Sequence, residues 1–408
     1  MDVHATTNTN HNHNHNNNHN HHDHPTNAKK GRVAVVAITK HGLEIAGRLK
    51  SIMREWDVYA PEKFRAAPVA TSMMEVNWYN EPSAVLISKL FNSYNALICI
   101  FSLGAVIRMI APYIRDKRSD PAVLVIDDAA RFVISALSGH LGGANALARL
   151  VARILNSTPV ITTAADVNET IAVDLLGSEF GWRIDEASEH NITMLSAAMV
   201  NEEPIGIYQD AGERGWWSKE LPKNVRIFNS IDELNASGLK ALIITDRLID
   251  DSRYAELLGR AVVYRPKSLV VGLGLHWDTS SDEIARGIEN TFKDAMLSMY
   301  SIRCIATLER GYEVKGLKEF SERTGIPVEY YTKEQLASIK VPNPSTLVKM
   351  YEGTPSVAEA AALASASGKG GKDMEKDREK CELVVEKRKF PPNLTVAVAR
   401  IIYDSQQQ

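Results

Sequence analysis

A strand, a glycine-rich turn and an amphipathic helix follow one another in this chain and constrain its fold most. The apolar run Phe132–Ala136 predicts a buried strand, and apolar residues at helical spacing predict a helix over Gly142–Leu155. A helix N-terminus presents unpaired N–H groups that attract anions, and glycine lets a ligand approach the backbone. The alternative is that the glycines only permit close packing. The turn residues that are candidates for binding a ligand are Ser138, Gly139, His140, Gly142, Gly143 and Asn145.

Two side chains of this turn have a candidate chemical role. His140 can transfer a proton or bind a carboxylate, because the ordinary pKa of histidine lies near neutrality. Ser138 is expected to cap the helix rather than to act as a nucleophile, since no Gly-x-Ser-x-Gly motif surrounds it. Leu141 is expected on the apolar face of the helix.

Strands alternate with helical patterns along the rest of the chain, which predicts an α/β protein of several domains with mostly parallel sheets covered by helices. In the middle part, a helix is expected over Glu186–Asn201, and Tyr264–Pro266 is interpreted as a linker. The expected parts are a tail and an N-terminal, a middle and a C-terminal domain, over residues 1–30, 31–170, 171–267 and 268–404.

The tail is rich in histidine and asparagine and has no apolar periodicity, so we expect it to be disordered. Clustered imidazoles can bind cobalt, nickel or zinc weakly, although such affinity can also be incidental. No metal site is expected in the folded core, where cysteine and histidine lack metal-binding spacing. The histidines of this possible weak metal site are His11, His13, His15, His19, His21, His22 and His24.

Composition excludes two classes of partner. A net charge of -3 argues against a general nucleic-acid binder, and no apolar run reaches the about 18 residues of a membrane span. The N-terminus lacks the apolar region of a signal peptide. The 3 cysteines lie far apart, and Cys99 and Cys304 are expected to be buried thiols. Together these features predict a cytoplasmic protein.

Other candidate residues lie near the ends of predicted elements. Asp128, beside Asp127, ends an apolar run, where a carboxylate can be a general base or simply form a turn. Arg108 can pair with a ligand carboxylate or form a surface salt bridge. Thr163 can bind a ligand or cap a helix. The motif Gly272-x-Gly274 lacks the third glycine of a dinucleotide site, so a nicotinamide cofactor is not expected.

Six motifs occur in the order that is typical of the CbiG family, the cobalt-precorrin 5A hydrolases of anaerobic cobalamin synthesis. The chain resembles this family from about residue 31 to residue 403. The motifs are Asp120–Asp127, Ser138–Asn145, Thr158–Thr163 with Asp166–Asn168, Arg303–Thr307, Pro355–Ala361 and Asn393–Ala399.

The resemblance implies an enzyme that opens the lactone of cobalt-precorrin 5A and releases a two-carbon unit as acetaldehyde, giving cobalt-precorrin 5B. It implies no dissociable cofactor, because cobalt is carried by the tetrapyrrole substrate, and it makes other cobalamin-pathway enzymes candidate partners. His140 and Asp128 are the expected catalytic residues. The expected substrate-binding residues are Ser138, Gly139, Gly142, Gly143, Asn145, Arg108 and Thr163.

Two positions depart from the family pattern. Leu103 replaces a threonine that usually precedes the glycine of the N-terminal motif, and Leu275 replaces a cysteine of the C-terminal domain. His276 and Trp277 stand where the family often has two arginines. These changes argue against an essential role for those positions. They also keep open the alternative of a non-catalytic carrier of corrinoid or cobalt. A hydrolase of another lactone is a second alternative.

Overall fold

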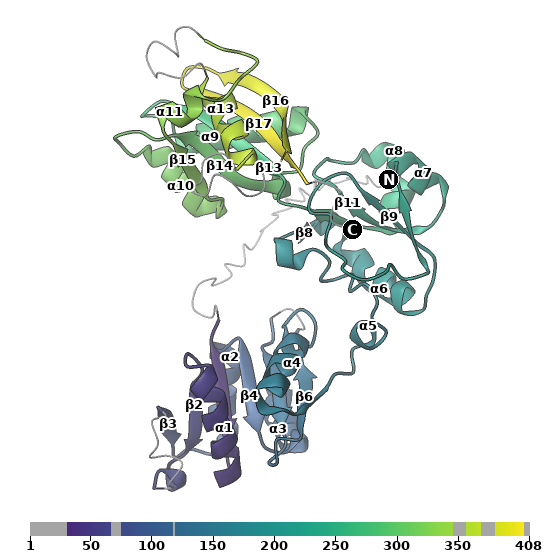
Figure 1. The fold of residues 1–408 in the computed structure, drawn as a ribbon, viewed down its shortest axis with the longest axis vertical. Coiled ribbons are helices and arrows are strands. Elements are labelled where there is room, and N and C mark those ends of the chain that lie inside the picture. The colour runs from purple at the N-terminus through teal and green to yellow at the C-terminus, as the bar shows by residue number, and fades with distance from the viewer. Residues whose placement is uncertain (1–30, 67–74, 117–118, 346–355, 369–379, 404–408) are drawn as a thin grey trace, which may run out of the picture. The chain divides into compact units, whose positions relative to one another are not determined.

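The computed structural model describes residues 31–66, 75–116, 119–345, 356–368 and 380–403. The histidines of the N-terminal tail lie outside these ranges. The chain divides into two compact units, Met1–Val160 and Ile161–Gln408. The first unit contains one sheet and the second contains two, and helices flank each sheet (Figure 1). The prediction of an α/β protein is therefore confirmed.

The first unit contains a seven-stranded sheet with the order β3-β2-β1-β4-β5-β6-β7. Neighbouring strands are parallel except β5 and β6, which are antiparallel. The last two strands therefore run against the other five. The strands are β1 Val33–Ala37, β2 Asp57–Pro61, β3 Val76–Tyr79, β4 Ala96–Ile100, β5 Ala122–Ile126, β6 Phe132–Leu137 and β7 Thr158–Val160.

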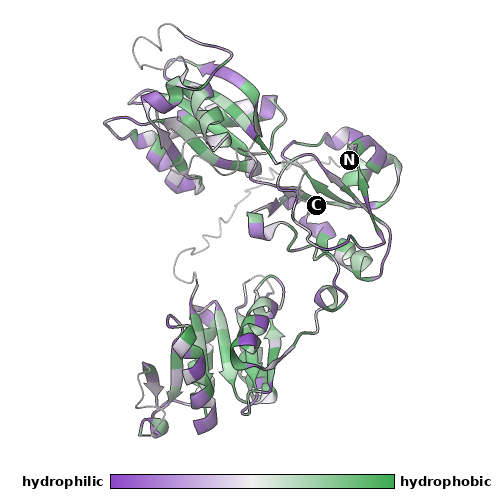
Figure 2. Ribbon diagram, viewed as in Figure 1, coloured by the Kyte–Doolittle hydropathy of each residue, from purple (hydrophilic) through white to green (hydrophobic). Residues whose placement is uncertain are grey.

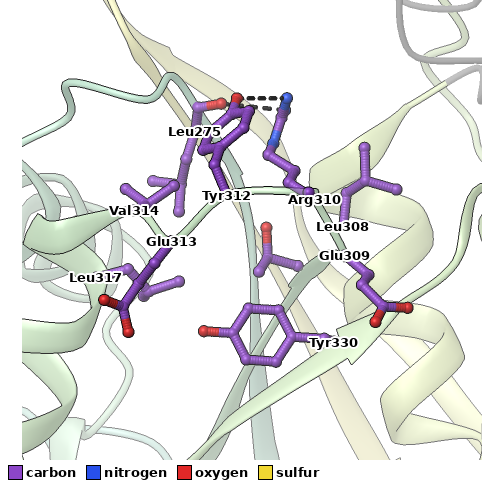
Figure 3. Close-up of a pocket in the computed structure, with 11 residues that line it drawn as sticks. Leu275, Leu308, Glu309, Arg310, Tyr312, Glu313, Val314, Leu317 and Tyr330 are labelled. Carbon is purple, nitrogen blue, oxygen red and sulfur yellow. Dashed lines mark hydrogen bonds between the residues drawn. The ribbon is translucent and has the colours of Figure 1, made fainter.

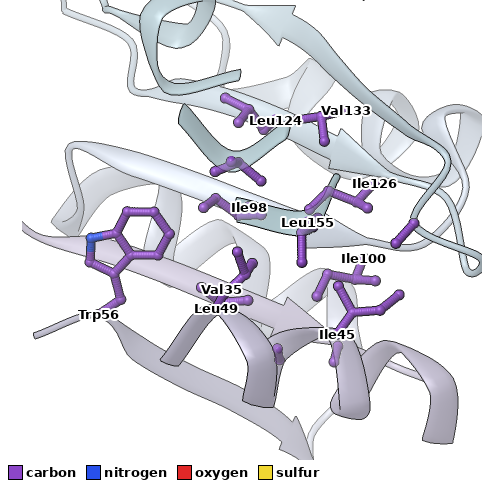
Figure 4. Close-up of a cluster of buried hydrophobic side chains, with 14 of the residues drawn as sticks. Val35, Ile45, Leu49, Trp56, Ile98, Ile100, Leu124, Ile126, Val133 and Leu155 are labelled. Atoms are coloured by element: carbon purple, nitrogen blue, oxygen red, sulfur yellow. The ribbon is translucent and has the colours of Figure 1, made fainter. Parts of the chain in front are cut away.

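Helices cover both faces of this sheet, so its central strands are apolar on both sides. Val35, Ile98 and Ile126 pack on one face with α1 and α4 (Figure 4), whereas Val36 and Cys99 pack on the other with α2 and α3. Burial raises the pKa of the Cys99 thiol to about 12, as expected for an inert buried cysteine. The helices are α1 Lys40–Ile52, α2 Ser83–Ser93, α3 Leu103–Ile110 and α4 Ala144–Leu155, with short 3-10 turns at Glu62–Phe64 and Ala111–Tyr113.

The middle part of the chain forms a five-stranded sheet with the order β10-β9-β11-β12-β8. Only β8 is antiparallel to its neighbour. The strands are β8 Arg183–Ile184, β9 Ile205–Gln209, β10 Val225–Phe228, β11 Lys240–Ile244 and β12 Ala261–Arg265. The helices are α5 Ala164–Val167, α6 Ile192–Val200, α7 Ile231–Ala236 and α8 Asp251–Leu258, with 3-10 turns at Ser178–Phe180 and Glu186–Asn191.

Two expectations for the middle part are wrong. The helix expected over Glu186–Asn201 is a 3-10 segment followed by the shorter helix α6. The expected linker is the end of β12, where Tyr264 and Arg265 are buried. Arg265 can be buried because its guanidinium pairs with Asp185 at 2.8 Å and donates to two backbone carbonyls.

The C-terminal part forms a third sheet, with the order β15-β14-β13-β17-β16. Strands β13, β14 and β15 are parallel, and β17 is antiparallel to both β13 and β16. In Figure 2 the strands are mostly apolar, whereas the helices alternate between polar and apolar positions. The elements are β13 Leu269–Leu275, α9 Ser281–Asp294, a 3-10 turn Met299–Ser301, β14 Ile302–Leu308, α10 Lys315–Thr324, β15 Val328–Tyr331, α11 Lys333–Ala337, α13 Val357–Ala366, β16 Lys380–Phe390 and β17 Leu394–Ile402.

The alanine-rich helix α13 packs very closely on β13. A Cβ atom built on Gly272 would lie 1.9 Å from the carbonyl oxygen of Ala358. Gly272 and Gly274 both lie inside the strand and pair with β17. Gly272 therefore makes room for a helix, and neither glycine lies in a phosphate-binding turn. In the part of the chain that the structure describes, no helix is long and apolar enough to cross a membrane.

Candidate functional site

The carboxyl edge of the first sheet contains a topological switch point. Strands β1 and β4 are neighbours, and the chain continues from β1 to β2 on one side and from β4 to β5 on the other. Open α/β sheets bind ligands in the crevice that such a reversal creates. Thr39 and Ser102, the residues that precede α1 and α3, follow these two strands directly. The fold therefore favours a ligand site at this edge.

Asp128 lies at this edge and contacts the start of α1. One of its carboxylate oxygens accepts a hydrogen bond from the hydroxyl of Thr39. The other oxygen lies 3.2 Å from Nδ1 of His41. Thr39 also caps α1, because its hydroxyl accepts the N–H of Gly42 at 2.9 Å. The three side chains thus form a connected cluster that the helix cap holds in place.

A histidine held by a carboxylate can act as a general base. When the Nδ1–H group donates a hydrogen bond to the carboxylate, the neutral ring keeps a lone pair on Nε2, which can accept a proton. His41 and Asp128 are both exposed, so water can reach the pair. Sequence reasoning missed Thr39 and His41. Thr39 comes just after the buried strand β1, which is the signal that singled out Asp128, whereas His41 already lies in the first turn of α1.

The glycine-rich turn lies at the opposite edge of the same sheet. Because β6 is antiparallel to β5, Leu137 pairs with Val123 at the start of β5, whereas Val133 pairs with Ile126 at its end. The five-residue strand β5 spans about 16 Å. His140 and Asp128 are therefore on different edges, and the structure does not bring the two expected catalytic residues together.

Within the turn, the helix begins later than expected. α4 starts at Ala144, and Gly143 takes the N-cap position with a φ of 80°. Ser138 does not cap the helix, so that prediction is wrong; its Oγ donates to the carbonyl of Asp120 at 3.1 Å. Leu141 precedes the helix and is exposed, which also contradicts its expected place on the apolar face.

Close packing is sufficient to explain two of the glycines. A Cβ atom on Gly142 would lie 2.3 Å from the Cβ of Ser138. A Cβ atom on Gly139 would lie 2.7 Å from the side-chain oxygen of Asn145, which is buried. The packing interpretation of this turn therefore has direct geometric support, and substrate binding there stays a prediction.

The remaining candidates of the first unit have local partners. The Nη1 atom of Arg108, in the last turn of α3, donates to the carbonyl of Gly104 at 3.1 Å. Leu103 is the first residue of α3 and packs against the apolar cluster on that face. Asp127 accepts the N–H of Phe132 at 2.6 Å and so closes the turn before β6. Burial alone would raise the pKa of Asp127, but this bond and the contact with Arg131 lower it.

Thr163 belongs to the second unit. It precedes the four-residue helix α5, and its side chain makes no capping hydrogen bond with that helix. Among the described residues, no group of three or more His, Cys, Asp and Glu side chains could hold a metal ion.

The C-terminal sheet carries a cavity of about 410 Å³ at its carboxyl edge. Leu275, Leu308 and Leu317 supply apolar walls, and Arg310 lies at the rim. Arg310 donates from Nη1 to the hydroxyl of Tyr312 at 3.1 Å and from Nη2 to the carbonyl of Leu275 at 3.2 Å. Figure 3 shows this pair at one end of the cavity and the ring of Tyr330 at the other. These two bonds fix the orientation of the Arg310 guanidinium at this edge of the sheet.

The three sheets with their flanking helices define a multidomain α/β protein. Comparison with known proteins assigns it to cobalamin synthesis. Family models described as "Cobalamin synthesis G N-terminal", "Cobalamin biosynthesis central region" and "Cobalamin synthesis G C-terminus" match residues 85–166, 171–266 and 269–399. The chain belongs to this cobalamin synthesis G family, CbiG, and the resemblance seen in its motifs is confirmed.

Two curated relatives resemble nearly the whole chain, and both are named cobalt-precorrin-5A hydrolase. The relative from Priestia megaterium is 42% identical over 379 residues, which cover 92% of this chain and 96% of the relative. The relative from Salmonella typhimurium is 29% identical over 346 residues, covering 83% and 93%. A solved structure of a cobalamin biosynthesis protein G homolog from Sulfolobus solfataricus is 22% identical, covers 91% of this chain and 97% of that one, and has a TM-score of 0.34.

Proposed function

We propose that this protein is a cobalt-precorrin 5A hydrolase of anaerobic cobalamin biosynthesis. It opens the lactone of its substrate and releases acetaldehyde, giving cobalt-precorrin 5B. The observation that carries this proposal is the identity of 42% to the hydrolase of Priestia megaterium, which extends over almost the full length of both chains.

The reaction needs a base and an acid. Water adds to the lactone carbonyl, and the bond between the acyl carbon and the ring oxygen breaks. The freed oxygen stays on the bridging carbon as a hydroxyl. The bond between this carbon and the macrocycle then breaks: the hydroxyl loses its proton and becomes the carbonyl of acetaldehyde, and the macrocycle carbon takes the bonding electrons and a proton. A side chain must take the proton of the attacking water and another group must stabilise the charge that develops.

Asp128 and His41 are the proposed acid–base pair. His41 accepts the proton of water at Nε2, and Asp128 holds the ring by its contact with Nδ1 at 3.2 Å. His140 at the opposite edge is the second candidate for proton transfer. The proposed substrate-binding residues remain Ser138, Gly139, Gly142, Gly143, Asn145, Arg108 and Thr163.

Further parts of the proposal concern cofactor, partners and location. The protein uses no dissociable cofactor, because cobalt enters with the tetrapyrrole. Its partner is this substrate, and other enzymes of the pathway are candidates for transient contact. The cytoplasm is the proposed location, supported by 2 buried free cysteines that suit a reducing compartment.

The test is acetaldehyde release by the purified protein supplied with cobalt-precorrin 5A. Asp128→Asn and His41→Gln should each lower kcat by about 100-fold or more, the usual contribution of a general base. Glu55→Gln, an exposed acid after the far end of α1, is the control and should leave kcat unchanged. Loss of activity in His140→Gln, with normal activity in the other two variants, would move the acid–base role to the glycine turn. Tight binding without acetaldehyde would instead indicate a carrier.

A further inference from the structure

The hydroxyl of Thr39 makes two hydrogen bonds of opposite sense at the carboxyl edge of the first sheet. Its oxygen accepts the N–H of Gly42 at 2.9 Å, which caps α1. The same hydroxyl contacts Oδ1 of Asp128. An ionised carboxylate can only accept a hydrogen bond, so the hydroxyl must be the donor in this contact. The single proton of the Thr39 hydroxyl is therefore directed to the carboxylate of Asp128.

The position of this hydroxyl is fixed by the elements around it. Thr39 is half-buried and has the extended backbone that is typical of an N-cap residue. Its β-branched side chain has few χ1 rotamers, and the bond from Gly42 selects one of them. Gly42 is confined in turn, because a Cβ atom there would lie 3.3 Å from the carbonyl oxygen of Ile100 at the end of β4. The hydroxyl thus belongs to a tightly packed junction of β1, α1 and β4.

The contact between His41 and Asp128 is exposed by comparison. Their side chains are 73% and 48% exposed, and Nδ1 lies 3.2 Å from Oδ2. Exposed pairs of this kind contribute little by themselves, because either side chain can turn to water instead. The two residues are also 87 positions apart in the chain. A further group that holds the carboxylate in place would keep the pair together for more of the time.

Thr39 is placed to supply this support, because it belongs to the same tight segment as His41. The hydroxyl holds Oδ1 of Asp128, and Oδ2 then faces Nδ1 of the ring. We propose that Thr39 is a positioning residue, whose hydroxyl keeps Asp128 against His41 and thereby keeps the proton of the neutral ring on Nδ1. The effect on turnover rests on the proposed function, whereas the form of the His41 ring can be measured without it.

The first measurement is acetaldehyde release by Thr39→Val, which nearly keeps the shape of the side chain and removes the hydroxyl. Its kcat should fall about tenfold, as expected when one hydrogen bond to a charged group is lost. KM should change little, because the inferred role is in proton transfer. Thr39→Ser keeps the hydroxyl and should recover most of kcat. In the Asp128→Asn background, Thr39→Val should cause no further loss, because the carboxylate that it positions is already absent.

Thr332→Val is the matched control. Thr332 also caps a helix, α11, and accepts the N–H of Gln335 at 3.3 Å. Both valine variants lose a helix cap and should unfold at a slightly lower temperature, but only Thr39→Val should lose kcat. Thr39→Gly lacks the hydroxyl while glycine is an acceptable N-cap residue, so it should lose kcat with little change in unfolding temperature. An equal loss of kcat in Thr39→Val and Thr332→Val would overturn the inference.

The second measurement reports on the His41 ring directly. The histidine nitrogens of the full-length protein are isotope-labelled for magnetic resonance, and the signals that vanish in His41→Gln belong to His41. In mildly alkaline solution, where an ordinary imidazole is neutral, the ring nitrogen shifts distinguish a proton on Nδ1 from one on Nε2. Thr39→Val should move His41 from the Nδ1–H form toward the Nε2–H form, and Thr332→Val should not.

The two measurements separate the positioning role from the proposed function. An unchanged ring form of His41 in Thr39→Val would overturn the inference, even in a protein that releases acetaldehyde. A changed ring form in a protein that releases none would support the positioning role and reject the hydrolase.

Discussion

The carboxylate of Asp246 accepts two hydrogen bonds from the guanidinium of Arg400, one on each oxygen and each 2.7 Å long. Asp246 follows β11 of the middle sheet, and Arg400 lies on β17 of the C-terminal sheet. The hydroxyl of Ser268 donates to the same carboxylate at 2.7 Å. The side chains of Asp246 and Arg400 are 0% and 8% exposed. This bidentate pair joins two sheets of the second unit through a buried contact.

Arg400→Met should strongly destabilise this unit. The substitution leaves the Asp246 carboxylate buried without its cation, which costs about 3–5 kcal/mol. Arg388→Met is the control, because Arg388 pairs with Asp294 at the surface and such pairs contribute about 1 kcal/mol or less. Urea unfolding followed by circular dichroism measures the difference. Equal shifts of the midpoint in the two variants would contradict a special role for the buried pair.

Asp210→Asn should stabilise the protein at neutral pH. Burial, together with the neighbouring Asp246 carboxylate, raises the pKa of Asp210 above its ordinary 3.8, although Thr245 and two arginines oppose the shift. A raised pKa means that this group favours the fold below pH 3.8 and that the benefit is lost as the pH rises through the folded-state value. The variant should therefore have a higher urea midpoint at pH 7 and no advantage below pH 3.8. An advantage that grows in acid would contradict this.

Gly272→Ala should destabilise the C-terminal sheet by about 1–3 kcal/mol, because α13 must move away from β13. The reason is the distance of 1.9 Å between an added Cβ and the carbonyl of Ala358. Gly215→Ala, where no atom lies within 4 Å, is the control and should change the thermal midpoint little. If both variants unfold at the same temperature, the close approach of α13 is not required.

His41 and Asp128 should act as a unit. The double variant His41→Gln/Asp128→Asn should then have a kcat close to that of the slower single variant, because each substitution disables the same pair. Independent roles would make the two losses multiply. The measurement is steady-state acetaldehyde release by the parent protein, both single variants and the double variant.

Removal of residues 1–30 should leave acetaldehyde release within about twofold of the full chain, since all proposed site residues lie in the domains that follow. The same truncation should abolish weak binding of Co²⁺, because the chain has 12 histidines and 8 of them are in this segment. A large loss of activity that added cobalt restores would indicate a tail that supplies metal.

Elements with a strong local pattern were predictable. Strands β4 Ala96–Ile100 and β5 Ala122–Ile126 are continuous apolar runs, the local pattern that marks strands covered on both faces. Strand β12 was missed although it is equally buried. Its arginine and the proline after it resemble a linker, and only the ion pair with Asp185 makes a buried Arg265 acceptable.

The candidate site was only partly predictable, for a related reason. Asp128 was found from its position after a strand, and Thr39 could have been found by the same rule, whereas His41 lies in the first turn of α1. The placement of Asp128 and His140 on opposite edges of the sheet could not have been predicted in this way. An alternating or apolar run indicates a strand but not its direction, and the antiparallel pairing of Ile126 with Val133 is what sends the glycine turn to the other edge.

By itself the sequence determined the family of this protein, its α/β class and most of its strands, because motifs and apolar periodicity are local properties of the chain. The tertiary structure alone decided which edge each loop reaches and which polar side chains meet. Asp246 and Arg400 are 154 residues apart, and a pair at that separation is brought together only by the packing of whole sheets.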